Sequence, residues 1–165
     1  MKRFIPALLA SAVLGLGAAH AADTVSSADR TFIAKVSQGG MFEVAAGQAG
    51  ATQGNTQDIR DQGATEAHDH ALVGAKLKAI ASAAGVTFPA NLNAQFQHEL
   101  DSLSALSGRA FDAAYLRDMK DIHAKDGAAF AMEAKGGTDP QLRGFAAETH
   151  RIVLRHIGEL DAVGP

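Results

Sequence analysis

The sequence predicts an all-α protein, a bundle of four long helices with a shorter fifth helix in the connection between the second and the third. Apolar residues recur every three or four positions along four stretches of about 22–29 residues, the spacing of one buried helix face. Short breaks containing glycine separate the first stretch from the second and the third from the fourth. About 25 residues separate the second stretch from the third, far more than a tight turn requires.

The first helix is expected to begin near Ser26 or Ser27, because either hydroxyl can cap the first turn, and to end at Gly54. Its inner face carries several glycines, each of which costs about 1 kcal/mol of helix stability relative to alanine. We therefore expect these glycines to permit the close approach of another backbone or to mark a kink. Glu43 falls on the same face, and the sequence leaves open whether its carboxylate is buried or reaches an edge.

The second helix is expected over residues 56–84, and its apolar stripe contains two polar residues. At 100° per residue, Glu66 and His70 fall at the centre of the stripe, one turn apart, whereas His68 points to solvent. A carboxylate and an imidazole in apolar surroundings cost free energy unless they are paired, hydrogen-bonded or bound to a metal. This pair is the first indication of a buried site.

The long connection begins at Gly85, which is a candidate left-handed cap for the second helix. Residues 86–88 are expected to be extended, because the residue before Pro89 avoids the α region. Apolar residues then recur at helical spacing over residues 91–106, which predicts a short amphipathic helix. A connection of this length can carry the chain along the whole bundle.

The third long helix is expected over residues 110–134, with His123 at the edge of its apolar stripe. The fourth has the clearest start in the chain. Asp139 is expected to be the N-cap, and Pro140 takes the first helical position, where its missing N–H is no loss. His156 lies at the centre of the stripe of this helix.

Helices joined by short, long and short connections are typical of ferritin-like folds, in which the second and third helices run parallel. In that topology the position of a residue along the bundle axis follows from the number of residues between it and the nearest turn, at a rise of 1.5 Å per residue. Five inward polar residues then fall within roughly 6 Å along the bundle axis. They are Glu43, Glu66, His70, His123 and His156.

Carboxylates and imidazoles that converge from facing helices predict a metal site, and this set suits zinc, iron, manganese or copper. Met119 or Asp126 could supply a further donor. A buried Glu–His hydrogen-bond network without metal would satisfy the same groups, and the alternative of a structural or envelope stress-related protein with such a layer stays open. A third reading is a peroxide-handling enzyme with two metals bridged by Glu43 and Glu66. The chain lacks the paired Glu-x-x-His motifs of dinuclear ferritin-like enzymes, so a protein without enzymatic activity is the default expectation.

Composition excludes several classes of function. The chain has no cysteine, which rules out disulfides, iron–sulfur clusters and thiol chemistry. Residues 22–165 carry 13 basic and 18 acidic residues without a Lys/Arg cluster, a balance that argues against a nucleic-acid partner. A homo-oligomer is left open.

Residues 1–21 are expected to be a signal peptide, removed after Ala21. Lys2 and Arg3 precede an apolar run from Phe4 to about Leu16, and an A-x-A cleavage site ends at Ala21. The apolar run is too short to span a membrane, and no later stretch is long and apolar enough. Residues 22–165 are therefore expected to form one exported, periplasmic domain.

The chain also resembles a known family along its whole mature length. The matching features include Asp29-x-x-Phe32, Asp69-His70 and, as the most specific part, Ser107-Gly108-x-x-Phe111-Asp112-x-x-Tyr115. These features are similar to those of the DUF4142 family of bacterial exported proteins, which are often labelled outer membrane proteins. The resemblance implies a ferritin-like helical bundle and names no activity. Because the chain has no cysteine to carry a lipid, we expect the periplasm rather than the outer membrane.

Overall fold

This computed structural model describes residues 25–163 of the chain. These residues contain five helices, joined by turns and one long connection, and no strand. The predicted signal peptide lies outside the described residues. The helices are α1 (Ser27–Gln53), α2 (Gln57–Ala83), α3 (Ala94–Ser104), α4 (Gly108–Gly136) and α5 (Pro140–Val163). The predicted all-α class with a short fifth helix is confirmed. The ends of α3 and α4 differ by two or three residues from the prediction, as is usual where helix ends fray.

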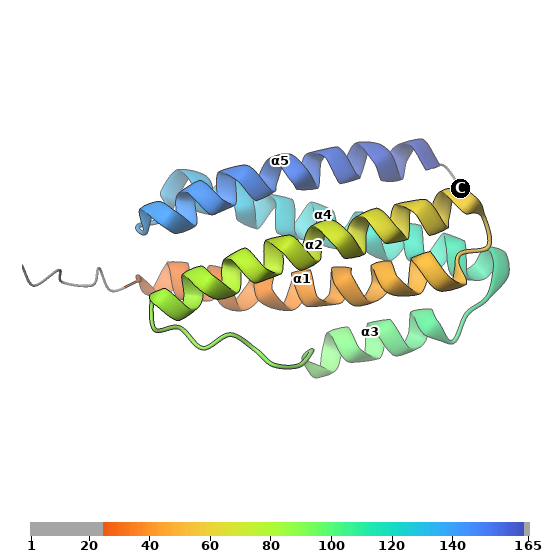
Figure 1. Cartoon of the computed structure of the whole chain (residues 1–165), viewed down its shortest axis with the longest axis horizontal. Coiled ribbons are helices and arrows are strands. Elements are labelled where there is room, and N and C mark those ends of the chain that lie inside the picture. Colours follow the sequence, from red (N-terminus) through yellow and green to blue (C-terminus); the bar gives the residue numbers. More distant parts are fainter. Residues whose placement is uncertain (1–24, 164–165) are drawn as a thin grey trace, which may run out of the picture.

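The helices form two antiparallel hairpins, α1 with α2 and α4 with α5 (Figure 1). The connection after α2 runs back along the outside of α1 and carries α3, so that α4 starts at the same end as α2. Consequently α2 and α4 run parallel, as the ferritin-like topology requires. None of the helices among residues 25–163 combines the length and the apolar character needed to cross a membrane.

Local sequence signals account for where these helices begin and end. Ser26 forms a capping box with Asp29, each side chain accepting a hydrogen bond from the backbone of the other. At the start of α5, Oδ1 of Asp139 accepts hydrogen bonds from the backbone of the next turn, with Pro140 in first position. Gly85 follows α2 with a φ of 66°, a left-handed conformation that glycine adopts without strain. The predicted caps are thus confirmed.

Glycines on α1 and α2 bring these two backbones into direct contact. A Cβ added to Gly63 would lie 2.4 Å from the backbone nitrogen of Ala51, and one added to Gly47 would lie 2.7 Å from that of Ala67. Neither position therefore tolerates a side chain without separating the helices. Of the two explanations considered for the α1 glycines, close backbone approach applies to Gly47.

The core consists of two apolar clusters with a buried polar layer between them. One cluster includes Ile33, Leu77, Phe130, Phe145 and Val153, and the other includes Phe42, Ile59, Tyr115, Met119 and Leu160. On every long helix, the polar residues predicted to share a layer lie near the point where one cluster gives way to the other, whereas Asp29 and Glu133 are buried at one end of the bundle. The apolar core thus encloses this layer from both ends of the bundle.

Candidate metal centre

The structure brings the five predicted polar residues together in the middle of the bundle. Each long helix contributes: Glu43 from α1, Glu66 and His70 from α2, His123 from α4 and His156 from α5. Each of them is at most 1% exposed. Burial of Glu43 decides the alternative that the sequence left open, and His123, expected at the edge of its stripe, is fully enclosed.

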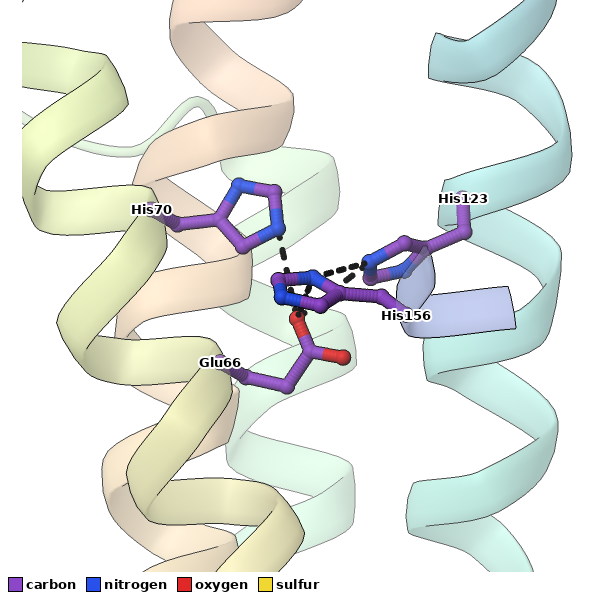
Figure 2. A group of neighbouring side chains, drawn as sticks. All are labelled: Glu66, His70, His123 and His156. Carbon is purple, nitrogen blue, oxygen red and sulfur yellow. Dashed lines mark hydrogen bonds and ion pairs between the residues drawn. The ribbon is translucent and has the colours of Figure 1, made fainter. Parts of the chain in front are cut away.

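The carboxylate of Glu66 is the point on which the three imidazoles converge (Figure 2). Its Oε2 atom lies 3.2 Å from Nε2 of His70, 3.2 Å from Nε2 of His123 and 2.9 Å from Nδ1 of His156. The two ring nitrogens of His123 and His156 that face each other are 3.3 Å apart. All four of these donor atoms lie within 4.8 Å of one another.

The second nitrogen of each imidazole faces a hydrogen-bond acceptor outside this group. Nδ1 of His70 lies 3.0 Å from Oε2 of Glu43, and Nδ1 of His123 lies 2.8 Å from the backbone oxygen of Met119. Nε2 of His156 lies 3.1 Å from Oδ2 of Asp69 and 2.9 Å from Nη2 of Arg155, a donor that pairs with the same carboxylate. A ring that donates its N–H outward presents the lone pair of its other nitrogen to the centre, which is the arrangement of metal-bound histidines.

Two further contacts stabilise the ionised carboxylates around the centre. Gln62 donates a hydrogen bond of 2.7 Å to Oε1 of Glu66, which holds that side chain with Oε2 towards the histidines. Arg155 pairs with Asp69 at the surface. Burial alone would raise the pKa of Asp69, but hydrogen bonds from His156 and Arg155 hold that pKa below its usual value.

The residues present fit a single transition-metal ion. In a tetrahedral site with metal–ligand distances of about 2.0–2.1 Å, neighbouring ligand atoms are about 3.3 Å apart. Of the six separations among the four ligand atoms, the three from Oε2 of Glu66 to the imidazoles and the one between His123 and His156 are 2.9–3.3 Å. The two from Nε2 of His70 to the other imidazoles are at most 4.8 Å, so His70 must move towards the ion to complete a tetrahedral site. Despite their proximity, Oε2 of Glu66 and Nε2 of His70 are not aligned for a hydrogen bond with any described residue. Two buried polar atoms without partners are what a shared cation would satisfy.

The electrostatics of the cluster also describe a metal-free state, in which a protonated histidine balances the negative charges of the carboxylates. Burial lowers the pKa of His70, but Glu43 and Glu66 outweigh this effect and raise that pKa to about 10. Glu66 changes in the opposite direction, because the neighbouring histidines outweigh its burial and lower the pKa of its carboxyl. A protonated His70 between two carboxylates is therefore the ionic form of this layer when only protons occupy it.

Sequence reasoning missed the outward partners of the histidines. In the sequence, Asp69 stands out only as part of the family motif, and Met119 suggests a sulfur donor rather than a backbone acceptor. The i, i+4 spacing of Gln62 and Glu66 was a local signal that could have been used. Asp126, the other extra donor considered, is buried beside the centre 4.0 Å from Lys35, and it is not among the four converging residues.

Comparisons with known proteins agree with this fold. The chain is similar to a solved structure described as "Crystal structure of DUF305 fragment from Deinococcus radiodurans". The TM-score is 0.73 at 13% identity, over 84% of this chain and 96% of that one, which supports the fold alone. No curated protein matches the chain. The family model described as "Domain of unknown function (DUF4142)" matches residues 15–163, and the protein therefore belongs to the DUF4142 family.

Proposed function

We propose that this protein binds one transition-metal ion in the core of its bundle, through Glu66, His70, His123 and His156. Glu43 and Asp69 act as outer carboxylates that orient His70 and His156. The observation that carries the proposal is the convergence of three imidazole nitrogens on Oε2 of Glu66, while the other nitrogen of His70 and of His123 faces an acceptor. The outer nitrogen of His156 faces both Asp69 and Arg155. A purely structural layer does not require three imidazoles to converge on one carboxylate oxygen.

The donor set favours zinc, with copper, iron and manganese as competitors. Three imidazole nitrogens and one carboxylate oxygen are borderline donors that suit all four metals. Four protein ligands without an exposed position are typical of structural zinc sites, whereas catalytic sites keep one position open. The described residues contain one such group of ligands, which favours a single ion over the dinuclear, peroxide-handling alternative.

Elemental analysis of purified protein tests the proposal, with two variants beside the wild type. We expect close to one metal ion per chain in the wild type, and loss of that metal in the double variant His70→Ala/His123→Ala. The control is His68→Ala, which changes an exposed histidine on the same helix and should keep the metal. Metal titrated into chelated wild type should raise the melting temperature, because only the folded state binds it.

A metal-free protein whose melting temperature does not respond to any of the four metals would contradict the proposal. The second candidate would then apply, a buried ion-pair layer in which protonated His70 joins Glu43 and Glu66. In that case His70→Gln would lower stability without changing any metal affinity.

We also propose that the chain acts in the periplasm. The support is the basic start at Lys2 and Arg3, the apolar run that follows, and the A-x-A site ending at Ala21. Cell fractionation with intact mass measurement tests it, and the expected product is a periplasmic chain that begins at Ala22. Recovery of the uncleaved chain from the cytoplasm would contradict this proposal.

A further inference from the structure

The side chain of Gln62 lies beside the candidate metal centre and is not one of its four converging ligands. Its amide nitrogen donates a hydrogen bond of 2.7 Å to Oε1 of Glu66, one turn further along α2. Gln62 is 6% exposed, so little water competes for this bond. Among residues 25–163, Gln62 is the one hydrogen-bond donor to Oε1. The orientation of this carboxylate oxygen therefore depends on Gln62.

The two oxygens of Glu66 consequently have different surroundings. Oε2 lies 2.9–3.2 Å from a nitrogen of each of the three histidines, whereas Oε1 points away from the imidazoles (Figure 2). A carboxylate can bind a cation through one oxygen or through both. Both oxygens are attached to the same carbon, so an ion on Oε2 is also close to Oε1 unless the carboxylate is held in one orientation. The hydrogen bond from Gln62 holds it.

The number of oxygens that Glu66 offers decides how many ligands the centre has. With one oxygen, the carboxylate and the three imidazoles make four donors, the number that structural zinc sites have. With both oxygens, the same residues would make five donors. Manganese(II) accepts more than four ligands and favours carboxylate oxygen, so it gains more from the additional oxygen than zinc does. The bond between Gln62 and Glu66 therefore bears on the choice of metal.

We infer that Gln62 is a specificity-determining residue of the metal centre: by holding Oε1 of Glu66, it keeps the site at four donors and favours zinc over manganese(II). This inference rests on the proposed function and goes beyond it, because it assigns a metal preference to a residue that is not a ligand. Zinc binds more tightly than manganese(II) to most sites of nitrogen and oxygen donors. Gln62 adds to that preference, and the addition is lost with its N–H.

Gln62→Met tests the inference, because it removes the amide donor and keeps an unbranched side chain of similar length. Competition with a chromophoric chelator should show that the ratio of zinc affinity to manganese(II) affinity falls about tenfold, the effect of losing one hydrogen bond to a charged group. Gln57→Met is the matched control. Gln57 donates a bond of the same i, i+4 type and length, 2.7 Å, to Asp61 at the surface of α2, so this variant should keep the wild-type ratio.

Cobalt(II) in place of zinc reports the number of ligands directly. Tetrahedral cobalt(II) absorbs visible light far more strongly than five- or six-coordinate cobalt(II). The wild type and Gln57→Met should therefore give the strong absorption, and Gln62→Met a much weaker one. A role of Gln62 in stability alone would change neither the absorption nor the ratio of affinities. Gln62→Asn, whose amide is one methylene group closer to the backbone, repeats both measurements if Gln62→Met does not fold.

The outcomes separate this inference from the proposed metal centre. A wild-type ratio of affinities in the Gln62 variants, or a cobalt(II) absorption as strong as that of the wild type, would contradict the role of Gln62 and leave the metal centre in place. A wild-type chain that takes up none of zinc, manganese(II) and cobalt(II) would contradict the metal centre, and the inference with it.

Discussion

Nδ1 of His70, on α2, lies 3.0 Å from Oε2 of Glu43, on α1. The carboxylate accepts the N–H of the ring and thereby turns Nε2 towards Glu66 and the other two histidines. Helix α1 supplies none of the four converging donor atoms, yet it sets the orientation of one of them. The candidate centre consequently depends on all four long helices.

Replacement of Glu43 by glutamine should weaken metal binding about 10–100-fold, the usual effect of removing an outer carboxylate from a ligating histidine. The amide oxygen still accepts from His70, but the charge that makes the ring a better ligand is lost. Competition with a chromophoric chelator measures the affinity. Glu148→Gln, at an exposed residue of α5, is the control and should bind as the wild type does. Equal affinities of the two variants would contradict a role for Glu43.

Asp69→Asn should also weaken metal binding, by about tenfold. Asp69 accepts from Nε2 of His156 and pairs with Arg155, so the variant removes the charge that orients this ligand. Stability without metal should change little, because a pair with a half-exposed arginine contributes at most about 1 kcal/mol. Asp61→Asn, an exposed change on the same helix, is the control. Equal metal affinities of Asp69→Asn and Asp61→Asn would contradict a role for Asp69 in orienting His156.

Gly63→Ala should destabilise the fold by about 1–3 kcal/mol, the usual cost of forcing an extra methyl group into a close contact. The new Cβ would lie 2.4 Å from the backbone nitrogen of Ala51, so α1 and α2 must separate. Gly144→Ala is the matched change in open space, and it should stabilise α5 by up to about 1 kcal/mol. Urea unfolding measures both. Similar stabilities of the two variants would show that this contact tolerates a side chain.

Titration of the Glu133 carboxyl should lower the free energy of unfolding as the pH rises from about 4.5 to about 7. Burial, followed by the negative charges of Asp29 and Asp139, raises the pKa of Glu133 to about 7 from its ordinary value of 4.5. Between these values the folded chain keeps a proton that the unfolded chain releases, so the free energy of unfolding falls with rising pH.

Glu133→Gln removes this titration, and the stability of the variant relative to wild type should therefore be greater at pH 8 than at pH 5. Urea unfolding of both proteins at the two pH values measures the difference. A relative stability that does not change with pH would contradict a raised pKa for Glu133.

Much of the fold was predictable because its signals are local. Helix caps such as Ser26 and Asp139 act within one turn, and the apolar period of each helix identifies the face that is buried. Because a helix rises by a fixed distance per residue, the position of each residue along the bundle axis then follows from its distance in sequence to the nearest turn. For this reason the shared layer of Glu66, His70 and His123 could be predicted before any contact was known.

Tertiary structure decided which atoms meet within that layer. The contact of Asp69 with His156 joins residues 87 positions apart, and the choice of Nδ1 or Nε2 at each ring depends on acceptors supplied by other turns and helices. An apolar cavity beside the centre, between α1 and α2, likewise requires Phe88, from the connection after α2, to lie near α1. Periodicity specifies the direction of a side chain to within one helix face, whereas ring orientation is set by the packing of several helices at once.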